Sequence, residues 1–274
     1  MIQNEKITQK LVFVHANGFP PNSYKILLEK LLENFSINNF LLRPLWDNKQ
    51  DYKLLKDWSL FYNDFNAFME DNNHNNIIGL GHSIGGNILL RTAIDNPKYF
   101  SKIILLDPIL FTPIINNLWK IVSLLKLQNR IHPLSKGALN RKMSYNTFDD
   151  IFKSYRRKSI FKNIDDLNLK VYIKSITKET HNGIEIIYSN LWENKIYNTG
   201  LLKDNYIWKH IKNLKIPCLI IRADNSNAFL DSSKNKISKL NQNILFKTIQ
   251  NSTHLFPLEY PDKSFNLIND FLSN

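Results

Sequence analysis

Half of the chain's eight glycines fall within one stretch, Gly79–Gly86, whose sequence is GLGHSIGG. A β-rich run, Asn76–His82, leads into it, and a helical pattern follows it. The pattern G-x-S-x-G at a strand-to-helix junction places the serine on a sharp, strained turn with its hydroxyl exposed. Cβ atoms at Gly81 and Gly85 would collide across such a turn. The stretch therefore predicts an exposed nucleophile, Ser83, between a buried strand and a helix.

Strand-like and helix-like segments alternate on both sides of this turn. Short apolar, β-branched runs predict six strands: Lys10–Ala16, Ile37–Leu45, Asn76–His82, Lys102–Asp107, Ile216–Arg222 and Ile244–Ile249. Apolar residues at helical spacing predict helices after Ser23, over Trp58–Met69, from Ser83 to about Phe100, and over Pro261–Leu272. This alternation predicts an α/β fold: a mostly parallel, twisted sheet with helices on both faces.

The alternation stops at Asp107 and resumes at Ile216. The segment between them is rich in helical periods and charge. In an open parallel sheet, ligands bind outside the carboxyl ends of the strands, where such an insertion begins. We therefore predict a split core, residues 1–110 and 216–274, with an inserted and mainly helical cap at residues 111–215.

The predicted cap carries nearly all of the net charge of +12. Between Phe111 and Lys215 there are 19 Lys and Arg residues against 8 Asp and Glu residues. This charge favours an anionic small-molecule substrate, an acidic partner or a membrane surface, unless it is simply a solvated helical face. Nucleic acid is not expected, because the dense basic cluster Arg156–Lys158 comes without a recognition motif. A monomer or a homodimer is expected.

The chain resembles the α/β-hydrolase fold family over its whole length, in the form of a bacterial-type serine hydrolase with a helical cap. The resemblance rests on the H-x-x-G loop His15–Gly18, the elbow at Ser83, the strand KIILLD, and His254 in NSTHLFPLEYPD before a terminal helix. It implies Ser83 as nucleophile and His254 as its base, in the chain order serine, acid, histidine. A serine hydroxyl needs such a base, and the base needs an orienting carboxylate. His82 is expected to be structural, and His15 to brace its loop.

The acid departs from the family pattern. Its usual position follows the strand IPCLIIR, where Ser226 and Asn227 carry no charge. The resemblance offers a second acid position at the end of the strand after the elbow helix, and Asp107 lies there. We favour Asp107 as the triad acid and keep Asp224, early in the loop after IPCLIIR, as the alternative.

Two backbone N–H groups are needed to stabilise the oxyanion of an acyl-transfer reaction. The resemblance assigns them to Ile84, directly after the nucleophile, and to Asn17 in the loop after the first strand. In the predicted cap, the amphipathic pattern Ile114–Leu125 includes Trp119 and suits a pocket roof. A later stretch resembles a cap segment of bacterial members and adds Trp192 and Tyr197 to the expected substrate pocket.

These residues predict hydrolysis of a small-molecule ester or related acyl bond through a Ser83–His254–Asp107 triad and an acyl-enzyme. One alternative is a carbon–carbon bond hydrolase acting on a carboxylated diketone, which the basic cap favours. The other is a non-catalytic ligand-binding protein built on the same fold. No metal, nucleotide or other cofactor is expected.

The expected compartment is the cytoplasm. The polar start MIQNEKITQK has no apolar signal segment. The longest apolar region, Ile103–Leu125, is interrupted by polar residues and prolines, so stable membrane insertion is not expected. Cys218 is the one cysteine, which excludes an internal disulfide framework.

Overall fold

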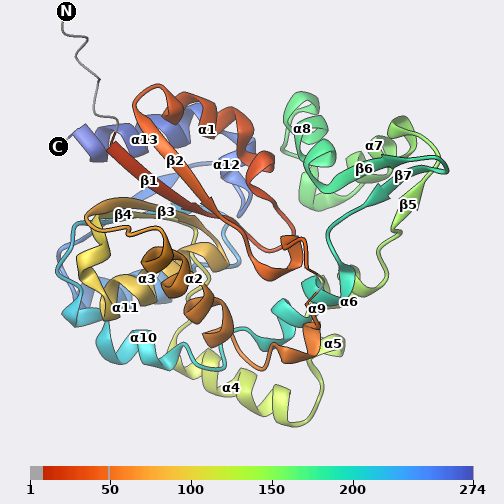
Figure 1. Ribbon diagram of the computed structural model, residues 1–274. Helices are drawn as coiled ribbons and strands as arrows, with labels where there is room; N and C mark the ends of the chain where they lie inside the picture. Colours follow the sequence, from red (N-terminus) through yellow and green to blue (C-terminus); the bar gives the residue numbers. More distant parts are fainter. Residues whose placement is uncertain (1–8, 49, 274) are drawn as a thin grey trace, which may run out of the picture.

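A six-stranded sheet forms the centre of the computed structural model, which describes residues 9–48 and 50–273 (Figure 1). The strand order is β2-β1-β3-β4-β8-β9, and every neighbouring pair is parallel. The strands are β1 (Gln9–Val14), β2 (Phe35–Phe40), β3 (Ile77–His82), β4 (Phe100–Leu106), β8 (Cys218–Ala223) and β9 (Ile244–Ile249). The predicted parallel sheet of an α/β fold is confirmed.

Helices cover both faces of this sheet (Figure 1). One face carries α1 (Lys25–Leu32), α12 (Phe256–Glu259) and α13 (Pro261–Ser273), and the other carries α2 (Ser59–Asp71), α3 (Ile84–Asp95), α10 (Asn205–His210) and α11 (Asp231–Leu240). Successive side chains of a strand point to opposite faces. Accordingly, Leu11 and Phe13 of β1 belong to one buried apolar cluster, and Val12 and Val14 to the other.

The chain between β4 and β8 adds no strand to the large sheet. Its helices are α4 (Pro113–Leu124), α5 (Gln128–Ile131), α6 (Pro133–Leu139), α7 (Phe148–Arg156), α8 (Asp166–Ile176), α9 (Asn190–Thr199) and the core-packed α10. It also forms a small antiparallel sheet, in the order β5 (Ser144–Tyr145), β7 (Gly183–Ile186), β6 (Thr177–Thr180), which the sequence analysis did not predict. Gly183, at φ 117°, begins β7 after the tight turn from β6. Short 3-10 turns cover Pro21–Tyr24, Arg43–Leu45, Tyr52–Leu54, Pro97–Tyr99, Ser159–Phe161 and Ile211–Asn213.

Two helix boundaries differ from the predicted ones. Helix α3 ends at Asp95 rather than near Phe100, because Pro97 disfavours helical backbone at Asn96. Ser23 does not cap a helix. It lies inside a 3-10 turn, and its hydroxyl hydrogen-bonds the hydroxyl of Ser175, 2.7 Å away.

Within residues 9–48 and 50–273, no helix is both long enough and apolar enough to cross a bilayer.

A buried carboxylate joins α3 to the segment that leads into α10. Asp204 is 5% exposed, and its Oδ2 accepts a hydrogen bond of 2.9 Å from the Asn87 side-chain amide. The same amide donates to the carbonyl of Ile109, 2.8 Å away. Burial raises the pKa of Asp204 from an ordinary 3.8 to about 7. The folded protein therefore retains a proton on Asp204 at pH values where the unfolded chain releases it.

This proton makes stability depend on pH. Between about pH 4 and pH 7 the folded state binds more protons than the unfolded state, so the contribution of Asp204 to stability falls as pH rises. One proton gives a slope of up to about 1.4 kcal/mol per pH unit. We expect Asp204→Asn, which keeps an oxygen to accept from Asn87, to flatten the free energy of unfolding across this range. Urea titrations at several pH values measure the free energy of unfolding of each variant, and Asp47→Asn, at an exposed site, is the control. Parallel profiles for the wild type and Asp204→Asn would contradict the raised pKa.

Candidate active site

Ser83 occupies a strained turn between β3 and α3. Its backbone has φ 59° and ψ −120°, a region that non-glycine residues seldom adopt. Three backbone hydrogen bonds hold this conformation: Ser83 N–H donates to Leu106 O over 3.0 Å, and its carbonyl accepts from Asn87 (3.2 Å) and Ile109 (3.1 Å). Strain of this kind persists only where the surroundings over-determine it.

The flanking glycines explain how the turn fits against the sheet. A Cβ at Gly85 would lie 2.1 Å from the carbonyl oxygen of Val14, at the end of β1. A Cβ at Gly81 would lie 2.7 Å from the backbone of Gly85. Neither atom can be accommodated, so the glycines allow the first turn of α3 to pack on the strand ends.

His254 lies between β9 and α12 and contacts both other candidate residues. Its Nε2 is 2.9 Å from Ser83 Oγ, and its Nδ1 is 2.7 Å from Asp107 Oδ2. An ionised carboxylate only accepts hydrogen bonds, so Nδ1 carries the proton and Nε2 accepts from the serine hydroxyl. The structure thus brings the three residues into one hydrogen-bonded series.

Asp107 directly follows β4, adopts φ 41° and is fully buried. Besides His254, its carboxylate accepts hydrogen bonds from the Ser226 hydroxyl (2.5 Å) and from Ala223 N–H (3.2 Å). Ser226 is one of the two positions where the resemblance places the usual acid. Here it acts as a donor to the carboxylate that reaches the same histidine from the neighbouring strand. That arrangement supports a charged Asp107 in a buried site.

Asp224 has a different environment. Its partly exposed carboxylate accepts hydrogen bonds from the backbone N–H groups of Ser252 (2.9 Å) and Asn251 (2.7 Å), which lower its pKa. These bonds tie the loop after β8 to the turn that precedes His254. Asp224 therefore holds the backbone of the histidine loop and does not contact the imidazole.

A second buried histidine supports His254 from beneath. His82 Nε2 lies 2.9 Å from the carbonyl of His254, so it must donate, and Nδ1 then accepts from the Tyr24 hydroxyl at 2.7 Å. The Tyr24 oxygen in turn accepts a 3.4 Å hydrogen bond from the backbone N–H of Ala16. Burial holds the pKa of His82 well below its ordinary value, so the ring is neutral. This series connects the loop after β1 to the loop that carries His254.

His15 ties the loop after β1 to the chain beyond β2. Its Nε2 accepts from Leu42 N–H at 3.1 Å, and its Nδ1 donates to Ala16 O at 2.8 Å. Burial lowers the pKa of His15 to about 4, which keeps the ring neutral and suited to both bonds.

The two expected oxyanion donors lie at the same cavity. Ile84 begins α3, where the first backbone N–H groups have no partner within the helix. Asn17 precedes Gly18, which adopts φ 77°. The Asn17 side chain is engaged elsewhere: it accepts from the Tyr188 hydroxyl and donates to Glu193 O, each at 3.1 Å. The backbone N–H of Asn17, rather than its side chain, is therefore the candidate donor to an oxyanion.

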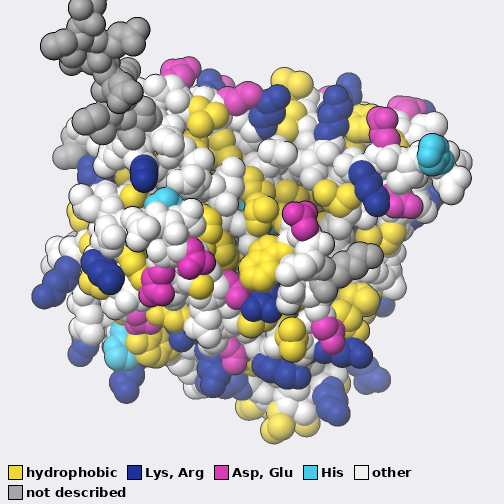
Figure 2. Space-filling model, in the orientation of Figure 1, with side chains coloured by type: hydrophobic (Ala, Val, Ile, Leu, Met, Phe, Trp, Pro, Cys, Tyr) yellow, Lys and Arg dark blue, Asp and Glu magenta, His cyan; other side chains and the backbone are white. Residues whose placement is uncertain are grey.

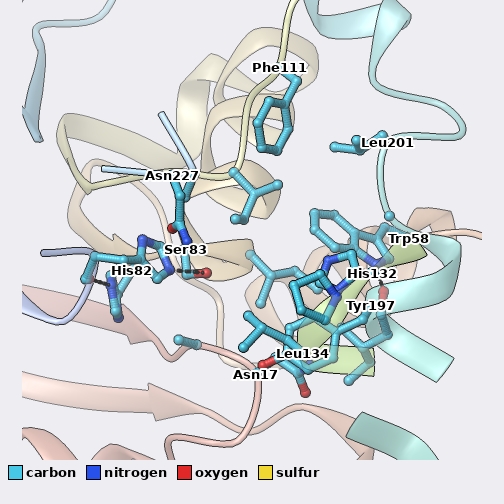
Figure 3. A pocket seen from close by; sticks show the side chains of 18 of the residues that line it. Asn17, Trp58, His82, Ser83, Phe111, His132, Leu134, Tyr197, Leu201 and Asn227 are labelled. Atoms are coloured by element: carbon cyan, nitrogen blue, oxygen red, sulfur yellow. Dashed lines mark hydrogen bonds between the residues drawn. The ribbon is translucent and has the colours of Figure 1, made fainter. Parts of the chain in front are cut away.

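The cavity above Ser83 has a volume of about 370 Å³. Figure 3 shows Ser83 on one side of it and Trp58, His132 and Tyr197 on the other. Its walls are mainly apolar, and no described lining residue is an Asp, Glu, Lys or Arg. The apolar and aromatic walls come from Phe19, Trp58, Ile109, Phe111, Ile115, Trp119, Ile131, Leu134, Ile160, Ile196, Tyr197, Leu201 and Leu255.

The expected pocket residues divide into two groups. Trp119 and Tyr197 line the cavity. Trp192 does not: it is 4% exposed, contacts Phe61 in the core, and donates its indole N–H to Gln50 O at 3.1 Å. The sequence analysis missed His132, whose ring stacks on Tyr197 with centroids 5.1 Å apart.

Comparison with known proteins places the chain in a family. Residues 49–259 match the family described as serine aminopeptidase, S33. The chain belongs to this α/β-hydrolase family. It is a hydrolase, as the sequence analysis expected.

Curated relatives match over a shorter region. A type I acyl-CoA thioesterase, mpaH, of Penicillium roqueforti (strain FM164) is 27% identical over 114 residues, which cover 36% of this chain and 26% of the relative. Its counterpart in Penicillium brevicompactum is 26% identical over the same length. The chain thus spans about a quarter of the length of these relatives.

Solved structures match over nearly the whole chain and show the fold. E-2-(acetamidomethylene)succinate hydrolase is 15% identical with a TM-score of 0.76, covering 97% of this chain and 92% of its own. The peroxisomal α/β-hydrolase Lpx1 of Saccharomyces cerevisiae is 18% identical with a TM-score of 0.73, covering 97% and 75%. The thioesterase domain of the curacin biosynthetic pathway is 11% identical with a TM-score of 0.71, covering 96% and 92%.

The two carboxylates can be distinguished by mutation. We expect Asp107→Asn to lower kcat by about 10⁴-fold, because an amide in this place stabilises the wrong imidazole tautomer. Asp224→Asn keeps a side-chain oxygen for the backbone of the histidine loop, so a loss within about tenfold is expected. Steady-state kinetics on an ester substrate compare the two. A larger loss in Asp224→Asn would contradict the geometry.

The Tyr24–His82 series gives a separate prediction. Tyr24→Phe leaves His82 Nδ1 and Ala16 N–H without a partner and shifts the loops that they hold. We expect kcat to fall about tenfold or more, since small misplacements of catalytic groups cost up to about 10²-fold. The pH profile should not move, because Tyr24 does not titrate in the working range. Tyr155→Phe is the matched control, since the Tyr155 hydroxyl is buried with no hydrogen-bond partner. Equal kinetics in the two variants would show that the series has no positioning role.

Proposed function

We propose that the protein hydrolyses an ester or related acyl bond of a small, apolar carboxylic acid. The observation that carries the proposal is the hydrogen-bonded series Ser83–His254–Asp107, open to a mainly apolar cavity whose described lining includes no Asp, Glu, Lys or Arg. Such a series supplies a nucleophile, a base and an orienting acid in the geometry of acyl transfer.

The reaction follows from the positions of the protons. Ser83 Oγ attacks the substrate carbonyl carbon while His254 Nε2 takes the hydroxyl proton, and Asp107 stabilises the imidazolium. The carbonyl oxygen becomes an oxyanion that accepts hydrogen bonds from the backbone N–H groups of Ile84 and Asn17. The intermediate then expels the alcohol or thiol, which leaves with the proton from His254. Water repeats the cycle on the acyl-enzyme and releases the acid.

The cavity walls narrow the substrate class. A carboxylated diketone needs a cation to pair with its carboxylate in a water-poor site, and a peptide with a free amino terminus needs an anion. The described lining supplies neither. A neutral apolar acyl group fits, which separates the proposal from the diketone alternative and from an aminopeptidase activity.

A thioester is a second candidate. The curated relatives are acyl-CoA thioesterases, and a thiol leaving group uses the same series of residues. The excess of Lys and Arg in residues 111–215 favours the phosphates of a coenzyme A group outside the apolar cavity.

Two matched esters test the substrate class. We expect kcat/KM for p-nitrophenyl butyrate to exceed that for mono-p-nitrophenyl glutarate, which adds one carboxylate, by about tenfold or more, because the carboxylate finds no partner. Ser83→Ala should lower kcat by about 10⁴-fold or more and abolish labelling by a fluorophosphonate. An unchanged melting temperature in Ser83→Ala is the folding control.

Three results would contradict the proposal: preference for the carboxylated ester, turnover by Ser83→Ala, or ligand binding without turnover by the wild type. A kcat/KM for butyryl-CoA that exceeds the ester value and falls with rising salt would instead select the thioester candidate.

A further inference from the structure

Helix α4 directs an apolar stripe into solvent. Ile114, Leu118, Ile121 and Leu125 follow the spacing i, i+4, i+7, i+11, which places them on one side of the helix. They are 74%, 57%, 56% and 60% exposed, and Leu124 beside them is 82% exposed. Contiguous exposed apolar surface of this kind marks an interaction site more often than chance exposure of single residues does.

The opposite side of α4 is engaged with the protein. Asn116 is fully buried and donates to Asn205 Oδ1 of α10 over 3.0 Å. Ile115 and Trp119 line the cavity above Ser83. A helix that only covers a core would turn its most apolar side inward and a polar side outward. Here a polar side chain is buried and the apolar stripe faces outward, so packing within this chain does not account for the stripe.

The charged residues of the chain segment that forms α4 and α5 have one sign. No Asp or Glu occurs between Asp107 and Asp149. Exposed Lys120 lies in α4, exposed Lys126 in the turn that follows, and exposed Arg130 in α5. The ion pairs among the described residues include none of the three. Figure 2 shows hydrophobic side chains flanked by Lys and Arg along the lower edge of the molecule, where α4 lies in Figure 1.

We propose that this surface of α4 docks on an anionic lipid bilayer. The apolar stripe enters the boundary between headgroups and acyl chains, and the flanking cations pair with lipid phosphates. A second copy of the chain fits less well, because a two-fold interface would bring the basic α4–α5 segments of the two copies together. The inference goes beyond the proposed function, and vesicle binding tests it without any turnover.

Docking in this orientation has a consequence for the cavity. The side of α4 that lies opposite the stripe contributes Ile115 and Trp119 to the cavity wall. The membrane would then lie against the outside of the helix that lines the candidate active site.

Co-sedimentation of the full chain with vesicles tests the proposal. We expect binding to phosphatidylcholine vesicles that contain about 30% phosphatidylglycerol, weak binding to phosphatidylcholine alone, and loss of binding at about 0.5 M salt, where charges are screened. Leu118→Gln with Leu124→Gln should lower the partition coefficient about fivefold or more, since glutamine preserves the helix but not the apolar surface. Lys120→Gln with Lys126→Gln should lower it on anionic vesicles.

Matched controls carry the same chemical changes elsewhere. Leu167→Gln with Leu245→Gln alters residues that are 65% and 52% exposed on other elements, and Lys234→Gln with Lys239→Gln removes the same charge from α11. Both should bind like the wild type, and melting temperatures show that all variants are folded.

Three outcomes would overturn the proposal: no binding to anionic vesicles, equal loss of binding in variants and controls, or a wild-type dimer in sedimentation velocity that Leu118→Gln with Leu124→Gln makes monomeric. The last outcome would assign the stripe to a second copy of this chain.

Discussion

The left-handed backbone of Ser83 is the constraint on which the candidate site depends. An isolated serine does not hold this conformation, so the fold must impose it. The parallel sheet does so by placing the end of β4 beside β3, from where Leu106 and Ile109 bond the Ser83 backbone. Glycine at position 85 lets α3 approach β1 closely enough to complete the turn. The sheet, and not the side chain, therefore determines where the hydroxyl points.

Two neutral histidines hold the loops around Ser83 in place. His15 and His82 are both buried, and desolvation keeps each ring uncharged. A neutral imidazole donates one hydrogen bond and accepts another. It can therefore join two loops when one loop offers a carbonyl and the other offers a donor. Each ring occupies such a position, one between the loops after β1 and β2 and the other between Tyr24 and His254. Because both rings stay neutral, the hydrogen bonds that hold these loops do not change with pH near neutrality.

Sequence patterns predicted the large sheet well because each buried strand carries a short apolar run, and the glycine-rich turn has few alternative structures. The choice of Asp107 came from the family resemblance, which offers an acid position at the end of the strand after the elbow helix. The small sheet β5-β7-β6 escaped prediction, since its strands are only two to four residues long, too short for a sequence period to stand out. Trp192 shows the other limit: an aromatic residue fits a core and a pocket equally well, and tertiary packing decides. The sequence of the basic segment also could not show that the described cavity lining has no Lys or Arg, because it does not show which way a lysine side chain points.

The position of Asp107, the proposed triad acid, directly after β4 changes what the loop after β8 must do. When a triad carboxylate belongs to that loop, any change in loop length or course displaces the acid and disables the enzyme. Here Asp107 directly follows β4, the neighbour of the strand that leads into Ser83, and the loop contributes the Ser226 hydroxyl and the lining residues Asn227 and Ala228. Catalytic geometry and substrate contact are thereby separated between a rigid strand and a surface loop. Provided that Ser226 and Asp224 are kept, the lining positions of this loop can vary as substrates change without displacing Asp107, and directed evolution of specificity should begin there.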